Sequence, residues 1–124
     1  MATDKQTITE SEYRIMKILW KSEKKLTVSD VVKELDGDDW TASTVSTFLQ
    51  RLLKKGVISC DKKGKTNLYY PLLKQRDYDM SETTSFLDKI YSGSVKNLMA
   101  ALVENKKISK KDISELREIF DLEQ

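Results

Sequence analysis

The sequence contains no histidine and only one cysteine, Cys60. Without histidine, neither a Ser-His-Asp nor a Cys-His nucleophile system can be assembled, and the commonest zinc ligand is missing. A single cysteine can form neither an intrachain disulfide nor a cysteine cluster for a metal. These absences argue against an enzyme, against a metal site and against a cofactor, and they fit a protein of the reducing cytoplasm.

Long apolar runs are missing as well. No stretch approaches the ~18 consecutive apolar residues of a membrane-spanning helix, and the first residues lack the apolar region of a signal peptide. We therefore expect a cytoplasmic protein with no membrane insertion. The 124 residues include one proline and four glycines, with 34% charged and 39% apolar residues. This composition excludes a disordered chain but supports only thin helical layers, which a second copy of the chain would complete.

Capping signals predict where the first helices begin. Thr9 and Glu12 have the three-residue spacing of a capping box, in which each side chain accepts from the other residue's backbone amide. Thr27 and Asp30 repeat this spacing, and apolar residues follow each pair at helical intervals. Gly37 is the expected end of the second helix, because glycine is the usual residue after a helix C-terminus.

The third predicted helix has one apolar and one polar face. Thr41 can cap it, and Gly56 follows its last turn. Its polar face contains no Asp or Glu and carries Ser43, Thr44, Ser46, Thr47, Gln50 and Arg51, with Lys54 in the last turn. A face of short hydrogen-bonding side chains and cations suits the edges and phosphates of nucleic acid.

The apolar period then changes from 3.6 to 2. Residues 57–61 and 66–70 alternate as two strands around Lys62-Lys63-Gly64-Lys65, which predicts a hairpin with a basic tip. Helix, turn, helix and basic hairpin is the layout of a winged helix-turn-helix. We therefore predict a mainly α protein with a small β-hairpin, in which residues 1–72 form a winged helix-turn-helix DNA-binding domain.

The charge distribution supports this interpretation. Residues 1–72 carry 13 basic and 10 acidic side chains, a net of +3, whereas residues 73–124 carry 9 and 10, a net of −1. From Arg51 to Lys65 there are six basic residues against Asp61 alone. The predicted DNA-binding residues are Thr41, Ser43, Thr44, Ser46, Thr47, Gln50, Arg51, Lys54, Lys62, Lys63 and Lys65.

Plainer interpretations stay open for several of these features. The polar helix face could be an ordinary solvated surface, and the hairpin lysines could serve solubility alone. Trp40 is expected to be a packing residue, with a contact to a nucleic-acid backbone as the alternative, and Cys60 is expected to be a half-buried strand residue rather than a redox sensor. The alternative function is a winged-helix protein-interaction module without specific DNA binding.

Residues 73–124 predict a three-helix dimerisation lobe. Its short amphipathic helices have too little mass to bury their own apolar stripes, so we expect a homodimer that binds an inverted-repeat operator in double-stranded DNA. The alternative is that the last stripe is part of an intrachain core. The predicted dimerisation residues are Phe86, Ile90, Leu98, Leu102, Ile113, Leu116 and Phe120.

Four motifs, spread over nearly the whole chain, resemble the penicillinase/methicillin-resistance repressor family (the BlaI/MecI/CopY type). They are Thr9-x-Ser11-Glu12-Tyr13-x-x-Met16-x-x-Leu19-Trp20, Asp39-Trp40-Thr41-x-x-Thr44-Val45-x-Thr47-x-Leu49-x-Arg51-Leu52-x-Lys54-Lys55-Gly56, Tyr69-Tyr70 and Phe86-x-x-Lys89-x-Tyr91-x-Gly93. The resemblance implies a dimeric transcriptional repressor that binds a dyad operator in the major groove and blocks transcription of a β-lactam-resistance or stress-response gene. Thr44, Thr47 and Arg51 fall on the family's recognition helix, whereas Ser43 and Ser46 stand where relatives often have longer basic side chains.

The resemblance also implies a route to derepression. In the β-lactam branch, a membrane sensor-protease acts on the repressor at an Asn-Phe bond in the helix after the turn at Gly93. The matching pair here is Ala101-Leu102, so the region carries over as a possible cleavage region, but the Asn-Phe bond does not. The copper branch carries a C-terminal cysteine cluster, which this chain lacks.

Overall fold

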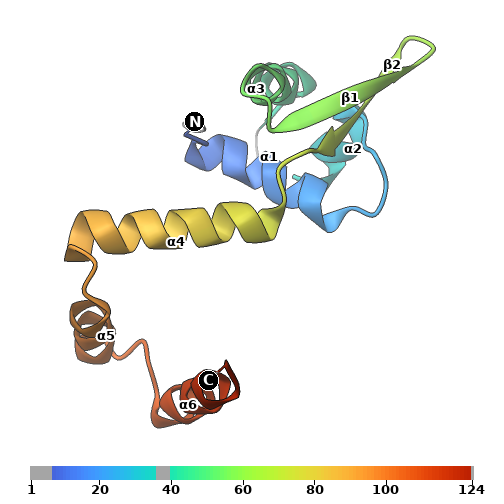
Figure 1. Ribbon diagram of the computed structural model, residues 1–124. Helices are drawn as coiled ribbons and strands as arrows, with labels where there is room; N and C mark the ends of the chain where they lie inside the picture. The colour runs from blue at the N-terminus through green and yellow to red at the C-terminus, as the bar shows by residue number, and fades with distance from the viewer. Residues whose placement is uncertain (1–6, 36–39, 124) are drawn as a thin grey trace. The chain divides into compact units, whose positions relative to one another are not determined.

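The computed structural model describes residues 7–35 and 40–123 (Figure 1). These residues form a mainly α fold with one two-stranded antiparallel sheet, which confirms the predicted fold class. The chain divides into two compact units, residues 1–78 and 79–124. The elements are α1 (Glu10–Lys21), α2 (Val28–Glu34), α3 (Ala42–Lys54), β1 (Ile58–Lys63), β2 (Thr66–Pro71), α4 (Gln75–Tyr91), α5 (Val95–Glu104) and α6 (Lys110–Glu123).

Reciprocal capping boxes begin α1 and α2, as the sequence predicts. The Thr9 hydroxyl accepts from the Glu12 amide at 3.2 Å, and the Glu12 carboxylate accepts from the Thr9 amide at 2.9 Å. In the same way, the Thr27 hydroxyl accepts from the Asp30 amide at 3.1 Å, and the Asp30 carboxylate accepts from the Thr27 amide at 3.0 Å. Each box satisfies two amides that the first helical turn leaves without an internal partner. The predicted stop at Gly37 lies outside the described residues.

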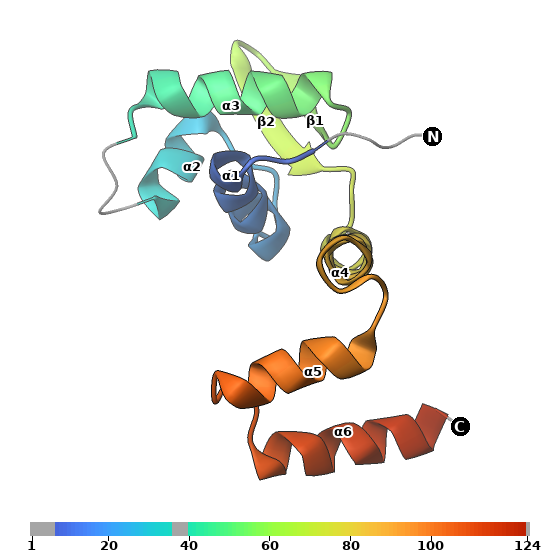
Figure 2. The same ribbon diagram turned by 90° about the vertical axis from the view of Figure 1, so that its left-hand side faces the viewer.

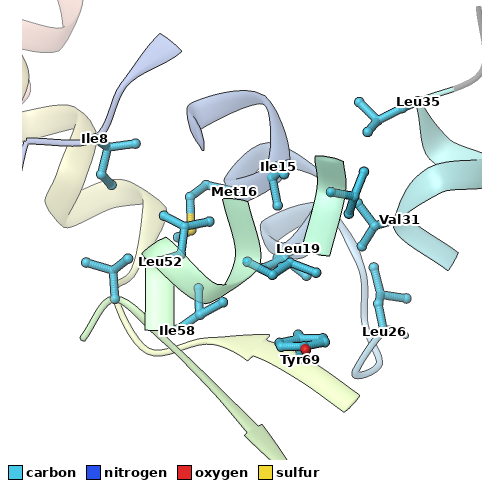
Figure 3. Packing of buried hydrophobic residues seen from close by; sticks show 13 residues of the cluster. Ile8, Ile15, Met16, Leu19, Leu26, Val31, Leu35, Leu52, Ile58 and Tyr69 are labelled. Carbon is cyan, nitrogen blue, oxygen red and sulfur yellow. The ribbon is translucent and has the colours of Figure 1, made fainter. Parts of the chain in front are cut away.

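Three helices and the hairpin enclose one hydrophobic core, shown in Figure 3. Helix α3 lies across α1 and α2, with the hairpin beside it (Figure 2). The buried apolar side chains come from every element of this first unit, so the core fixes α3 and the hairpin relative to each other. They are Ile8, Ile15, Met16, Leu19, Leu26, Val31, Leu35, Val45, Leu49, Leu52, Val57, Ile58 and Tyr69.

The hairpin is longer than the alternation in the sequence predicts. Lys62 pairs with Asn67 and Lys63 with Thr66, so both lysines belong to β1 rather than to the turn. Only Gly64 and Lys65 remain between the strands, and Gly64 has a φ of +64°. A glycine with positive φ as the first of two loop residues allows a tight turn that matches the strand twist, and this lets pairing continue to the tip.

The first unit continues past residue 72 through contacts made by aromatic rings. The Trp20 indole Nε1 donates to the Leu73 carbonyl at 2.7 Å. The Tyr78 ring, in the first turns of α4, lies 5.6 Å from the Tyr13 ring and 5.9 Å from the Trp20 ring, centroid to centroid. Residues 76–82 are helical, because they belong to α4. Their first part packs on α1.

The second unit consists of helices whose apolar side chains stay accessible. A capping box begins α6: the Ser109 amide donates to the Asp112 carboxylate at 2.9 Å, and the Asp112 amide donates to the Ser109 hydroxyl at 3.0 Å. None of the described residues from 79 to 123 is buried. Among the described residues of the whole chain, no helix combines the length and the apolar content that crossing a membrane requires.

Candidate nucleic-acid interface

Helix α3 turns one face to the core and the other to solvent. Val45, Leu49 and Leu52 are fully buried and anchor the helix. The polar face carries no carboxylate. Most of its predicted DNA-binding residues are exposed, namely Thr41, Ser43, Thr47, Gln50, Arg51 and Lys54, while Thr44 and Ser46 are half-buried.

Local hydrogen bonds orient the hydroxyl groups at the start of this face. The Thr41 hydroxyl accepts from the Thr44 amide and donates to the Thr44 hydroxyl, both at 3.2 Å. The Thr47 hydroxyl donates to the Ser43 carbonyl at 3.0 Å. Bonding to the preceding turn holds Thr47 in one rotamer, because a β-branched side chain has few rotamers in a helix. The face therefore presents threonines in fixed orientations.

Aromatic rings support the cationic end of the same face. The guanidinium carbon of Arg51 lies 5.4 Å from the centroid of the Phe48 ring. Phe48 in turn lies 5.1 Å from Trp40, and the guanidinium carbon of Arg14 lies 4.7 Å from the Trp40 centroid. Trp40 and Phe48 are half-buried and pack on the hydrophobic core, which confirms Trp40 as a packing residue.

The hairpin extends the positive charge beyond α3. Lys62, Lys63 and Lys65 are all exposed at or beside the tip. Because successive side chains of a strand point to opposite faces, Lys62 and Lys63 lie on different faces of the ribbon. The lysines therefore surround the tip and do not form a single row.

Asp61, the one acidic residue between Arg51 and Lys65, is paired. Its carboxylate forms an ion pair with Lys25, which lies outside that segment, before α2. The hydrogen bond to Asp61 raises the pKa of Lys25, and the Lys25 ammonium also lies 4.5 Å from the Tyr70 ring centroid. Sequence spacing gave no signal for Lys25, because the contact joins residues 36 positions apart.

Lys55, one of the six basic residues in that segment, is paired within the first unit. Its ammonium lies 2.5 Å from the Glu12 carboxylate and donates to the Thr7 carbonyl at 2.7 Å. Glu12 is only 1% exposed, so the lysine supplies the charge that this buried carboxylate needs. Burial raises the pKa of Glu12, but the hydrogen bonds from Lys55 and Thr9 outweigh it and leave the pKa lowered.

The single thiol lies in the hairpin, and the carboxylates form no metal-binding cluster in the part of the chain that is described. Cys60 is half-buried in β1 and pairs with Tyr69 of β2, as expected for a strand residue. Residues 7–35 and 40–123 contain no group of three or more His, Cys, Asp or Glu side chains that could hold a metal ion. The interface described above therefore consists of hydroxyl groups, an amide and cations.

The predicted dimerisation residues lie on α4, α5 and α6. Phe86 is 48% exposed, Leu116 46% and Phe120 62%, and the α6 stripe is therefore not buried within this chain. Leu102 and Leu116 also line an open hollow between α5 and α6. Ile119, which lies on the same stripe of α6 but outside the predicted set, is 57% exposed. The full predicted set comprises exposed Phe86, Ile90, Ile113, Leu116 and Phe120 and half-buried Leu98 and Leu102.

The fold and this interface define a winged helix-turn-helix protein, with α3 in the position of the recognition helix. The sequence model of the penicillinase repressor family matches residues 8–122. The chain belongs to that family.

Two relatives and one solved structure show how far the similarity extends. The penicillinase repressor of Bacillus licheniformis is 32% identical over 115 residues, covering 92% of this chain and 89% of the relative. The methicillin resistance regulatory protein MecI of Staphylococcus aureus is 31% identical, with 92% and 93% covered. The solution structure of monomeric Bacillus licheniformis BlaI in complex with the blaP half-operator is 34% identical, with a TM-score of 0.50, and covers 59% of this chain and 89% of that one.

Proposed function

We propose that this protein is a DNA-binding transcriptional repressor that reads double-stranded DNA with α3 and holds its backbone with the hairpin. The carboxylate-free, solvent-facing side of α3, joined by the core to a lysine-tipped hairpin, carries this proposal. The structural relative bound to a half-operator supports it, because the similarity covers 89% of that relative and 59% of this chain.

Each class of side chain has a distinct role in the proposed complex. Thr44 and Thr47 have the length to reach base edges or thymine methyl groups, and Arg51 has the planar donors to reach a guanine. Lys54 and the hairpin residues Lys62, Lys63 and Lys65 bind phosphates, since flexible point charges suit positioning better than base recognition. The remaining members of the proposed set are Thr41, Ser43, Ser46 and Gln50.

We further infer a homodimer formed through the helical region after residue 72. The exposed apolar side chains of α4, α5 and α6 support this step, because burying them against a second copy removes them from water. A two-fold dimer presents two α3 helices to an inverted-repeat operator. Binding at an operator that overlaps a promoter would then block transcription by RNA polymerase in the cytoplasm.

The names of the relatives suggest the class of target and the route to induction. A penicillinase repressor and a methicillin resistance regulator point to a β-lactam-resistance gene, with a stress-response gene as the alternative. We propose a membrane sensor-protease as a partner that acts near Ala101-Leu102, both half-buried in α5. A protease binds extended backbone, so α5 must unwind locally before cleavage, and loss of the dimer would then follow.

Selection from a pool of random DNA duplexes, at about 150 mM salt where weak non-specific binding is suppressed, tests the proposal. We expect the full-length protein to enrich an inverted repeat and to sediment as a dimer. A variant in which Lys62, Lys63 and Lys65 are all changed to Glu should lose DNA affinity while remaining folded. A folded dimer that enriches no duplex would instead indicate a protein-interaction module.

A further inference from the structure

The exposed Arg51 of the α3 face rests against a stack of aromatic rings. Its guanidinium carbon is 5.4 Å from the Phe48 ring centroid, within the ~6 Å reach of a cation–π contact. The Phe48 ring lies 5.1 Å from the Trp40 ring, and the two planes are tilted by 33°. Both rings are half-buried and pack on the hydrophobic core, so Arg51 contacts a ring that cannot move freely.

We propose that Phe48, supported by Trp40, is a positioning residue that orients Arg51 to read a guanine and thereby sets the base preference of this protein. The inference rests on the proposed DNA binding and deepens it. Thr44, Phe48 and Arg51 are four and three residues apart and therefore lie along one edge of α3. Phe48 thus lies between the half-buried Thr44 and the exposed Arg51 along this edge, and its ring contacts the guanidinium at the border of the exposed face.

The chemistry of guanine recognition explains why orientation matters here. Guanine presents two acceptors, O6 and N7, in the major groove, and an arginine binds both only when the plane of its fork is aligned with the base. An arginine side chain free in solvent must give up many rotamers to reach that geometry. A phosphate accepts donors from many directions. The Phe48 ring should therefore strengthen binding to the correct sequence more than binding to DNA in general.

Arg14 completes the stack from a different helix. Its guanidinium carbon lies 4.7 Å from the Trp40 centroid, and Arg14 belongs to α1. Trp40 therefore contacts both a cation of α1 and the Phe48 ring of α3. This arrangement ties the orientation of Arg51 to the three-helix core, and not to α3 alone.

A Phe48→Leu variant tests the proposal, since leucine keeps an apolar side chain and removes the ring face. The probes are the duplex that the unaltered protein enriches and a scrambled duplex of the same composition. We expect a roughly three- to tenfold loss of affinity for the enriched duplex, the size of one cation–π contact, and an unchanged affinity for the scrambled one. On an Arg51→Ala background, Phe48→Leu should cause no further loss, because the group it positions is gone.

Leu53→Ala is the matched control. Leu53 is also half-buried on α3 and packs on the same core, but helical spacing places it on the opposite edge of the apolar stripe from Phe48. The Leu53→Ala variant should lower the midpoint of urea unfolding and leave unchanged the ratio of its affinities for the enriched and the scrambled duplex. If Phe48→Leu does not fold, Phe48→Met replaces it, because methionine fills similar volume without a ring.

NMR relaxation of the Arg51 Nε–H group gives a readout that requires no DNA. In the free protein the group should be ordered, and in Phe48→Leu it should become mobile on the nanosecond timescale. Equal mobility in both proteins would overturn the positioning role, as would a loss of affinity that is the same for both duplexes. Failure of the unaltered protein to enrich any duplex would overturn DNA reading itself, which is a separate result.

Discussion

Breaking the Glu12–Lys55 ion pair should destabilise the first unit by an amount that depends on which of the two residues is replaced. The Glu12 side chain is 1% exposed and that of Lys55 is 22% exposed. In Glu12→Gln, the amide oxygen can still accept from the Thr9 amide, and Lys55 can turn toward water. In Lys55→Met, the carboxylate stays buried with the Thr9 amide and hydroxyl but without its cation. The lysine substitution should therefore be the more harmful of the two.

The expected magnitudes follow from these exposures. Removing one partner of a fully buried pair costs about 3–5 kcal/mol, and an exposed pair contributes about 0–1 kcal/mol. We expect a loss of about 3 kcal/mol in the free energy of unfolding for Lys55→Met, near the buried limit. For Glu12→Gln we expect about 1–2 kcal/mol, because the capping bond survives and the lysine can be rehydrated.

The pH dependence of the same variants provides an independent check. The pKa of Glu12 is lowered in the folded state, so its contribution to stability is present above the pKa of the unfolded chain and is lost as pH falls through the folded pKa. The difference between the unaltered protein and Glu12→Gln should therefore be largest near neutral pH and should shrink in acid, where glutamic acid is uncharged like glutamine.

Urea unfolding followed by circular dichroism at pH 7 and at several acidic pH values measures both effects. A double-mutant cycle with both substitutions isolates the coupling between the two side chains. Equal stability of the two single variants, or a difference that does not shrink in acid, would refute the assignment of Lys55 as the cation that neutralises a buried carboxylate.

Three further predictions concern the dimer, the end of the first unit and the proposed phosphate contacts. Leu116→Asp should convert the proposed dimer to a monomer without lowering the stability of the first unit, because Leu116 is 46% exposed within one chain. An unchanged sedimentation profile would contradict this prediction. Tyr78→Ala should lower the free energy of unfolding by about 1–2 kcal/mol, because the Tyr78 ring contacts both Tyr13 and Trp20. An unchanged urea midpoint would show that α4 does not unfold together with the first unit. Lys54→Ala should weaken binding to all duplexes alike and reduce the salt slope by about one, whereas a sequence-dependent loss would assign Lys54 to a base.

Much of the fold was readable from the sequence because its signals are local. Capping boxes join residues three positions apart, and the apolar stripe of α3 repeats within a few turns, so spacing alone predicts both. The change of period after Gly56 marks the hairpin in the same way, and the absence of carboxylates on the outer face of α3 identifies the proposed interface. None of these features depends on how distant segments meet.

The contacts between distant residues were decided only by the tertiary structure. In the sequence, Lys55 and Lys25 cannot be told apart from the hairpin lysines. In the fold, Lys55 pairs with Glu12, 43 positions away, and Lys25 pairs with Asp61, 36 positions away. Arg51 was predicted from its place on α3, but its support by Phe48 and Trp40 depends on how residue 40 packs beside the helix. The sequence by itself thus determined the elements and the chemistry of the outer face, since these follow from short-range spacing. The tertiary fold determined which charges are paired with one another, since folding brings groups together irrespective of their separation along the chain.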